Sequence, residues 1–288
     1  MTSPQTILKA WNLRARKELG QNFLREPTLA ENIVNLAAIG CQDLVLEIGA
    51  GLGAMTIPAA RRARRVIAVE KDRLLVPLLQ AELLAQGLQH VQVMEANILA
   101  LDLNRLAEQE GQAFVVIGNL PYNISSQVMV KLITERRSVR RAVLMFQKEL
   151  ADRLCAAPGN RTYGRLSVLL QYCAEMKVLR EIKAEMFYPK PKVGSTVLQI
   201  DFKARIEPQV SDEALMIRVV QAAFGQRRKT LRNALAGGLL PLGGDGAAAV
   251  LEAAAIDPQR RAETLSVADF VRLTDAVGRY LVRPDRQA

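Results

Sequence analysis

Short apolar runs alternate with helical segments through the first half of the chain, and this alternation limits the possible folds more than any other feature. The runs that read as buried strands are 44–49, 66–70, 91–94, 114–117 and 142–146. Segments 54–65 and 72–86 between them have helical character, the second with Asp72 as its N-cap. Strands that alternate with helices form βαβ units around a parallel sheet. The sequence therefore predicts an α/β domain.

The pattern changes after about Gly164. Segments 177–182 and 196–202 read as two more strands, which close the sheet with an antiparallel member. Glu207 and Pro208 mark a linker, and the helices predicted beyond it are 211–224, 229–236, 246–254 and 266–277. We expect two domains: residues 1–206, with a basic N-terminal arm at 1–20, and a smaller all-helical domain at 207–288.

The charge of the chain favours a polyanionic partner. Of the 288 residues, 39 are Lys or Arg and 29 are Asp or Glu, which gives a net charge of +10. Nucleic acid is the simplest partner for such a chain. An anionic membrane surface attracts the same charge, but the sequence contains no basic amphipathic helix with an aromatic face and no apolar run near the length of a membrane span.

Cysteine and histidine usage argues against metal chemistry. Cys41, Cys155 and Cys173 are widely separated and lie among apolar residues, so we expect buried, reduced thiols and a cytoplasmic protein. The chain has a single histidine, His90, and no Cys-x-x-Cys pair. These features argue against a zinc site and against a Ser-His-Asp triad, and we expect no metal.

A glycine-rich loop follows the first predicted strand. It has the spacing Gly-x-Gly-x-Gly at Gly49, Gly51 and Gly53, where the backbone can turn tightly and approach a ligand. Glu70 ends the second predicted strand, where an acid can accept hydrogen bonds from both hydroxyls of a ribose. This pair of features fits NAD about as well as S-adenosylmethionine. The alternative is a plain strand–helix turn beside a solvated acid.

The segment Asn119-Leu120-Pro121-Tyr122 comes directly after a predicted buried strand. Ligands of open α/β sheets bind beyond the carboxyl ends of strands. An amide that accepts hydrogen bonds beside a ring that stacks suits a flat, amino-bearing base. The alternative is an ordinary turn in which the proline fixes φ and the tyrosine packs.

Together, these segments resemble the small-subunit (16S-type) ribosomal RNA adenine N6-dimethyltransferase family. The matching blocks occur in the family's order, at 17–24, 46–56, 69–70, 119–125, 147–149, 163–167, 187–195 and 224–232. The resemblance implies a Rossmann-like class I S-adenosylmethionine-dependent methyltransferase domain with a smaller C-terminal all-helical domain. It implies transfer of methyl groups to N6 of two adjacent adenosines near the 3′ end of small-subunit rRNA, within an immature ribosomal subunit. We also expect a monomer that binds no membrane.

The resemblance also implies roles for individual residues. The residues expected at the S-adenosylmethionine site are Gln21, Asn22, Leu24, Glu47, Gly49, Gly51, Gly53, Glu70, Asn97 and Asn119. Those expected to act on the adenine are Asn119, Leu120, Pro121, Tyr122 and Phe187. Those expected to grip RNA are Lys17, Lys190, Lys192, Arg227, Arg228, Lys229 and Arg232. The family usually has Asp at the position of Asn97, so a lower cofactor affinity is expected.

Within these sets, two expectations concern local structure. The cluster 227–232 is expected to open a helix after Gly225, so that several cations share one face and contact phosphates. Phe187 is expected to stack on the target base opposite Tyr122, and its alternative is a core side chain beside the last strand.

Three other functions stay open. The first is the resistance-type enzyme that dimethylates an adenosine of large-subunit rRNA; Leu120 and the block 224–232 match the small-subunit family better. The second is an NAD-dependent dehydrogenase, against which the glycine spacing and the lack of a suitable acid–base pair argue. The third is a ribosome-assembly factor with little catalysis, against which the presence of Glu70, Asn119 and Tyr122 argues.

Overall fold

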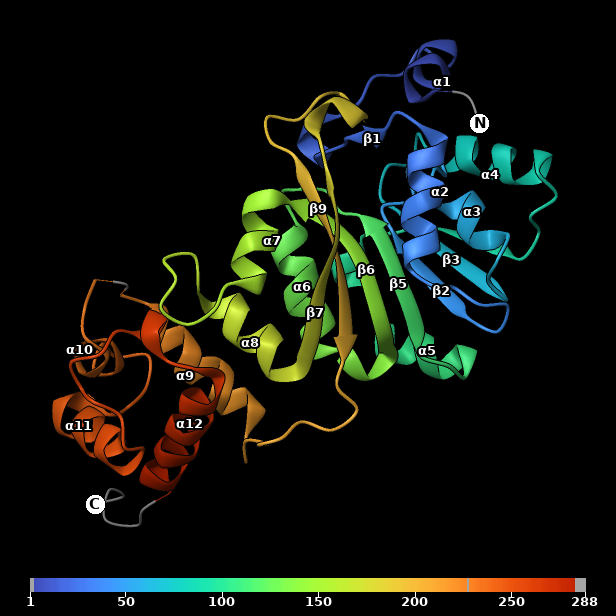
Figure 1. Cartoon of the computed structure of the whole chain (residues 1–288). Coiled ribbons are helices and arrows are strands. Elements are labelled where there is room, and N and C mark those ends of the chain that lie inside the picture. The colour runs from blue at the N-terminus through green and yellow to red at the C-terminus, as the bar shows by residue number, and fades with distance from the viewer. Residues whose placement is uncertain (1–2, 227, 283–288) are drawn as a thin grey trace. The chain divides into compact units, whose positions relative to one another are not determined.

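The structure is a computed structural model that describes residues 3–226 and 228–282 (Figure 1). It contains a seven-stranded sheet with the order β4-β3-β2-β5-β6-β9-β7. The strands are β2 (Leu44–Ile48), β3 (Arg65–Glu70), β4 (Val91–Glu95), β5 (Phe114–Asn119), β6 (Val139–Gln147), β7 (Ala174–Ile182) and β9 (Ser195–Phe202). A second, two-stranded sheet pairs β1 (Phe23–Leu24) with β8 (Phe187–Tyr188) in antiparallel register.

The sheet has the mixed direction that the sequence predicts. Strand β2 runs parallel to β3 and β5, β3 runs parallel to β4, and β5 runs parallel to β6. Strand β9 is antiparallel to β6. All five residues of β2 are buried, because parallel strands that are covered on both faces read as continuous apolar runs. The α/β prediction and the antiparallel member are confirmed.

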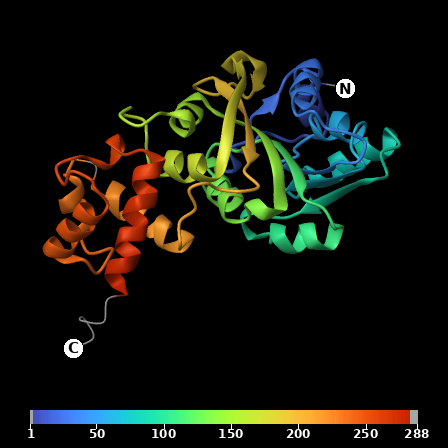
Figure 2. The same ribbon diagram turned by 60° about the horizontal axis from the view of Figure 1, so that its bottom comes forward.

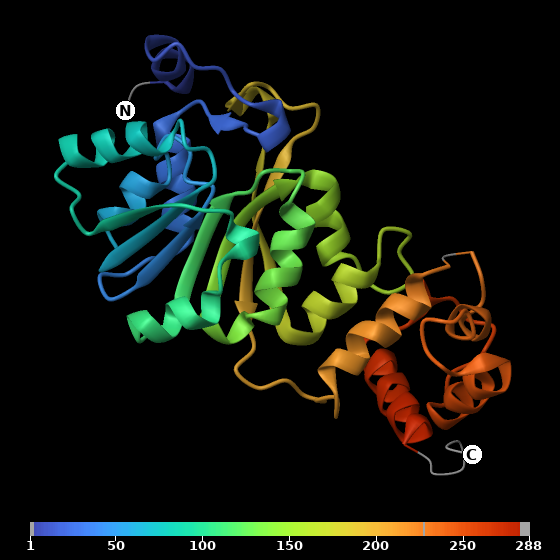
Figure 3. The same ribbon diagram turned by 180° about the vertical axis from the view of Figure 1, so that it is seen from behind.

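Helices cover both faces of this sheet. Figure 1 shows α2 and α3 in front of it, and Figure 3, seen from behind, shows α5 and α6 across the opposite face. The helices of this part of the chain are α1 (Pro4–Ala10), α2 (Pro27–Leu36), α3 (Thr56–Ala60), α4 (Val76–Ala85), α5 (Leu103–Glu110), α6 (Ser125–Thr134) and α7 (Lys148–Cys155). The short 3₁₀ helices of the described residues are η1 (Lys17–Leu19), η2 (Ile98–Ala100), η3 (Arg136–Ser138), η4 (Ala184–Met186) and η5 (Ala262–Thr264).

Two of the predicted helices begin or end elsewhere. The helix predicted at 54–65 is α3, which has five residues. The helix predicted at 72–86 is α4, which starts at Val76 with Leu75 as its N-cap. Asp72 as N-cap is therefore wrong. Its carboxylate accepts the Leu74 N–H at 3.2 Å, in the turn before the helix, and is also engaged by the N-terminal arm, as described below.

The chain divides into two compact units, one of residues 1–151 and 175–202 and one of residues 152–174 and 203–288. The division predicted from the sequence differs from this one mainly in residues 152–174. The helices of the second unit are α8 (Arg165–Cys173), α9 (Glu213–Phe224), α10 (Leu231–Leu235), α11 (Gly243–Ala253) and α12 (Val267–Leu281) (Figure 2). The four helices predicted beyond the linker are confirmed.

An aromatic cluster lies in the core of the second unit. The Phe224 ring stacks on the Phe270 ring with centroids 5.8 Å apart, and its edge meets Tyr163 at 6.2 Å. Asp212 caps α9 and Ser266 caps α12 through hydrogen bonds to backbone N–H groups in the first turn. These caps and rings define where the two longest helices of the unit begin and how they pack.

The expectation of three buried thiols is right only for Cys173. Cys41 is exposed in the turn before β2, and Cys155 is exposed as the last residue of α7. Apolar neighbours in the sequence did not bury these side chains, because Cys41 lies in a turn and Cys155 lies at the end of a helix. Within the described residues, no helix is long and apolar enough to cross a membrane.

Candidate functional site

The order of the strands predicts a ligand site before any side chain is considered. The chain builds β2, β3 and β4 outward on one side and then continues with β5 and β6 on the other, so the order reverses between β2 and β5. In open α/β sheets, ligands bind beyond the carboxyl ends of the strands at such a switch point. A pocket lies there. It is lined by residues at the ends of β2, β3, β4 and β5, and by residues 18–24, at the end of the N-terminal arm and just after it.

Nine of the ten residues predicted for the cofactor line this pocket. They are Gln21, Asn22, Leu24, Glu47, Gly49, Gly51, Glu70, Asn97 and Asn119. Pro121 also lines it. Segments that are far apart in the sequence therefore meet at one end of the sheet.

The loop after β2 turns tightly because its glycines adopt backbone angles that other residues disfavour. The φ angle is 76° at Gly49 and 56° at Gly51. A Cβ on Gly51 would lie 3.2 Å from the Phe23 ring, and a Cβ on Gly49 would lie 3.6 Å from Pro121 Cδ. The bare backbone of this loop therefore forms one wall of the pocket and lies directly against the turn that carries Pro121.

Glu70 fixes that loop from the neighbouring strand. It is 7% exposed and accepts hydrogen bonds from the Gly51 N–H and the Asp72 N–H, both at 2.8 Å. Burial raises the pKa of Glu70, and the two backbone donors lower it in part. Each carboxylate oxygen keeps a second lone pair. The side chain can thus support the loop and accept a ligand hydroxyl at the same time.

The N-terminal arm is attached to the pocket by Asp72, a residue that sequence reasoning missed as part of the site. Asp72 is 2% exposed and accepts hydrogen bonds from Gln21 Nε2 at 2.7 Å and Arg16 Nη1 at 3.3 Å. Gln21 Oε1 in turn accepts the Arg16 N–H at 2.8 Å. Because these bonds hold residues 16–21, they also fix Asn22, the next residue of the pocket wall.

Asn119 is oriented by a hydrogen bond from its own amide. Its Nδ2 donates to the Asn22 carbonyl oxygen at 2.7 Å, so its Oδ1 is the atom left to accept a hydrogen bond from a ligand. The next peptide is fixed as well, because the Leu120 N–H donates to Met145 O at 3.3 Å. The Pro121 carbonyl then accepts from Ser125 Oγ at 2.9 Å. The arrangement presents a directed acceptor at the end of β5.

Asn97 lies in the pocket at the end of β4, where it caps η2. Its Oδ1 accepts the Leu99 N–H at 3.2 Å. An aspartate makes the same cap, so the asparagine keeps the local turn without the charge. A ligand amine that reaches this position shares the oxygen with Leu99.

Four of the residues predicted for the cofactor or the adenine do not line the pocket. A Cβ on Gly53 would lie 2.7 Å from Leu79 Cδ1, so this glycine allows close packing of α4 against the loop. Tyr122 is half-buried, and its hydroxyl shares a hydrogen bond with Ser195 Oγ at 2.9 Å. Phe187 is 0% exposed within the core cluster. This is the position of a core side chain, and a stacking role for Phe187 stays a prediction that requires the ring to become accessible.

The fourth, Leu120, is 1% exposed, so its side chain is not accessible to a ligand, and a role for its backbone carbonyl stays a prediction. Of the charged residues predicted to grip RNA, Arg227 lies outside the described residues. The exposed ones are Lys17, Lys190, Lys192, Arg228, Lys229 and Arg232. Lys190 pairs with Glu185 at 2.8 Å.

The cluster predicted to open a helix after Gly225 has a different backbone. Helix α10 begins only at Leu231, so Arg228 and Lys229 lie in the preceding turn. The reason is tertiary, because the Leu231 N–H donates to Arg260 O at 2.7 Å and the Arg232 N–H donates to Pro258 O at 3.3 Å. The prediction that the whole cluster shares a helix face is therefore wrong.

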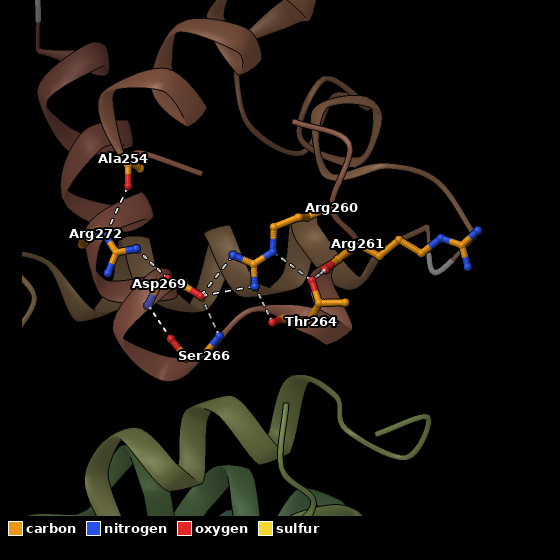
Figure 4. Close-up of polar contacts among 7 residues, drawn as sticks. All are labelled: Ala254, Arg260, Arg261, Thr264, Ser266, Asp269 and Arg272. Carbon is orange, nitrogen blue, oxygen red and sulfur yellow. Dashed lines mark hydrogen bonds and ion pairs between the residues drawn. The ribbon is translucent and has the colours of Figure 1, made fainter. Parts of the chain in front are cut away.

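The same contacts bring Arg260, and with it the neighbouring Arg261, next to the start of α10. Figure 4 shows the polar contacts around Arg260. Arg260 is engaged within its own unit: its guanidinium donates to Thr264 Oγ1 at 3.1 Å and pairs with Asp269 at 3.5 Å. Arg261 is exposed, and its side chain extends away from this network.

Comparison with known proteins gives a consistent result over nearly the whole chain. Residues 12–277 match the family described as ribosomal RNA adenine dimethylase. The chain is 51% identical to the ribosomal RNA small subunit methyltransferase A of Desulforapulum autotrophicum, covering 96% of this chain and 97% of that protein. It is 41% identical to the protein of the same name from Pelotomaculum thermopropionicum, covering 94% of each.

The structure is also similar to solved ones. It resembles the crystal structure of a dimethyladenosine transferase from Plasmodium falciparum with a TM-score of 0.74 and 26% identity, covering 87% of this chain and 95% of that chain. Its likeness to the 23S rRNA methyltransferase ErmE, with a TM-score of 0.65 and 23% identity over 89% of this chain and 99% of that chain, concerns the fold alone. The chain belongs to the ribosomal RNA adenine dimethylase family, enzymes that transfer methyl groups from S-adenosylmethionine.

Proposed function

We propose that this protein dimethylates N6 of two adjacent adenosines near the 3′ end of small-subunit rRNA during ribosome maturation, as a monomer in the cytoplasm. The observation that carries the proposal is the directed amide of Asn119 at the switch point of the sheet, beside the glycine loop. The choice of small-subunit rRNA is supported by relatives that are named as small-subunit methyltransferases, at 51% and 41% identity.

The strand order suggests how the cofactor lies. The polar residues at the strand ends follow one another along the sheet edge as Asn97 after β4, Glu70 on β3, Glu47 on β2 and Asn119 on β5. We assign the adenine to Asn97 and the ribose to Glu70, whose oxygens keep lone pairs for hydroxyls. The methionyl end then lies near Glu47 and Gly49, and the methyl group faces Asn119.

The residues at the end of β5 are suited to an amine that is a poor nucleophile. The N6 lone pair of adenine is delocalised into the ring. If the Asn119 Oδ1 and the Leu120 carbonyl accept its two N–H bonds, the nitrogen becomes pyramidal and its lone pair points at the methyl group. This is catalysis by positioning and electrostatic stabilisation, without a general base. S-adenosylmethionine supplies a good leaving group, and the released proton passes to water.

The target base must leave its stack to reach Asn119. Extruding a base costs roughly a few kcal/mol, and stacking on an aromatic ring returns about 1–3 kcal/mol per base. We assign this stacking to Tyr122, which follows Asn119 by three residues, is half-buried and shares a hydrogen bond with Ser195 through its hydroxyl. The ring can therefore offer a face of fixed orientation.

Exposed cations in both units supply the grip on phosphates. Lys17 and Lys192 belong to the sheet unit, and Arg228, Lys229 and Arg232 belong to the helical unit. Such contacts are independent of sequence and depend strongly on salt. They suit folded rRNA, which is recognised largely by shape and backbone.

The test is methyl transfer from radiolabelled S-adenosylmethionine to three purified substrates: immature small subunits, large subunits and naked rRNA. Nuclease digestion then identifies the labelled nucleoside, and the Asn119→Ala variant is the matched control. Dimethyladenosine formed only on small subunits supports the proposal. Labelling of large-subunit RNA favours the resistance-type activity, and tight cofactor binding without labelling favours an assembly factor.

A further inference from the structure

One buried carboxyl group in the pocket wall has no partner. Glu47 is 2% exposed, and its Oε2 forms no hydrogen bond with any of the described residues. The same is true of Thr56 Oγ1, at the start of α3. A buried carboxylate without a partner is costly, because both desolvation and a missing hydrogen bond disfavour the charged form.

The position of Glu47 in the sheet explains its environment. Side chains alternate along a strand, so Glu47 shares the face of Val45, which lies in the apolar core cluster with Met55 and Ile117. Glu47 is the last residue on this face of β2, and it lines the pocket. The carboxyl group thus has hydrocarbon on one side and the ligand site on the other.

The charges around Glu47 do not neutralise it. The pKa of Glu47 is raised to about 8, chiefly by burial. The Thr56 hydroxyl lowers it in part without reaching hydrogen-bond geometry, and the negative charge of Glu70 contributes to the rise. The other charged groups that line the pocket or border it are Arg16, Glu18, Lys71 and Asp72. Of the two cations among them, Arg16 is already paired with Glu18 and Asp72, and Lys71 is exposed to solvent. An empty pocket therefore favours the neutral acid.

The ligand brings the missing cation. In the placement given above, on which this inference rests, the methionyl end of the cofactor lies at the end of β2, and its α-amino group is positively charged. An opposite charge a few ångströms away favours the ionised carboxyl. We propose that Glu47 holds a proton while the pocket is empty and releases it when the methionyl ammonium binds, so that the ion pair forms only with the cofactor. Glu47 is thereby a positioning residue that selects ligands carrying an amino-acid end.

The proton can be counted. Binding of S-adenosylhomocysteine is measured by calorimetry near pH 7 in two buffers with different ionisation enthalpies, which gives the number of protons exchanged. Wild type is expected to release close to one proton, and its affinity is expected to rise about tenfold per pH unit up to about pH 8. 5′-Methylthioadenosine has no amino-acid end and is expected to release none.

Two variants test whether Glu47 itself is the source of the released proton. Glu47→Gln keeps the shape of the side chain and is expected to bind S-adenosylhomocysteine without proton release, whereas Glu31→Gln, an exposed carboxyl on α2, is expected to behave as wild type. Equal proton release by wild type and Glu47→Gln overturns the inference, and so does equal release with the two ligands. If wild type fails to bind S-adenosylhomocysteine at all, the placement of the cofactor falls, and the inference with it.

A second readout needs no ligand. The folded pKa of Glu47, about 8, lies above its value in the unfolded chain. As the pH rises from below that unfolded value to about 8, the unfolded chain loses this proton first, so the group's contribution to stability is lost. The melting temperature of the empty wild type is therefore expected to fall more steeply over this range than that of Glu47→Gln. Parallel melting curves contradict a neutral Glu47.

Discussion

Replacing Glu70 tests whether one side chain both holds the glycine loop and binds the cofactor. Glu70→Gln keeps one acceptor oxygen but turns an NH₂ group toward either the Gly51 N–H or the Asp72 N–H, each of which now bonds a carboxylate oxygen at 2.8 Å. A buried donor that loses its acceptor costs about 1–3 kcal/mol. Burial disfavours the charged carboxylate and raises the pKa of Glu70. Removing that charge therefore offsets part of this cost. Glu70→Ala removes both acceptors and is expected to cost about twice as much.

The loss of these hydrogen bonds is local to the glycine loop and the Asp72 amide, so amide hydrogen exchange without cofactor is the most direct assay. A cost of 1–3 kcal/mol corresponds to exchange about 5- to 150-fold faster at an amide that loses its acceptor, which is Gly51 or Asp72 in Glu70→Gln and both in Glu70→Ala. Glu95→Gln is the matched control, because Glu95 is the exposed register partner of Glu70 on β4. Cofactor binding is expected to weaken in both Glu70 variants. If exchange at Gly51 is unchanged in Glu70→Ala, the carboxylate does not hold the loop.

Three further predictions concern methyl transfer and RNA binding. Asn119→Ala is expected to keep measurable cofactor binding and to lose nearly all methyl transfer in the radiolabel assay; full activity rules out a role for the amide. Neutralising Arg228, Lys229 and Arg232 together is expected to weaken RNA binding and to lower the slope of log affinity against log salt by roughly 0.7–0.9 for each lost phosphate contact. An unchanged slope would show that other residues contact the phosphates. Tyr122→Phe is expected to keep most activity and Tyr122→Ala to lower it about 5- to 150-fold, from the 1–3 kcal/mol of one stacked base; equal activity of the two variants rules out stacking by this ring.

The central strands of the sheet could be predicted closely because they are buried on both faces. Strand β2 is an apolar run with one acid, Glu47, near its end, and in β3 the apolar residues 66–69 are followed by Glu70. Both patterns, and the glycines after Ile48, are visible in the sequence. The pocket follows from the strand order, which the alternation of elements already limits. Nine predicted cofactor residues meet there for this reason.

The contacts that hold the N-terminal arm could not be predicted, since they join residues distant in the sequence. Asp72 looks like a helix cap, because a short acidic residue stands before an apolar segment. In the fold, Arg16 and Gln21 engage its carboxylate, and α4 starts four residues later. Local propensity gave way to a tertiary contact.

The basic cluster of the helical unit shows the same limit. Its composition predicts an RNA contact, but the backbone of Arg228 and Lys229 is set by the bonds of Leu231 and Arg232 to the loop at Pro258 and Arg260. Phe187 is similar, because only the pairing of β1 with β8 shows that its ring lies in the core. Residue type indicates the chemistry available, and the fold decides where it is exposed.

The most direct test of the proposed function is to map N6,N6-dimethyladenosine in the rRNA of a strain that lacks its own small-subunit dimethylase and expresses this protein. We expect the modification to return at two adjacent adenosines near the 3′ end of the small-subunit rRNA, and to stay absent when the protein carries Asn119→Ala. Expression without dimethylation of that RNA, or dimethylation of large-subunit rRNA instead, would contradict the proposed function.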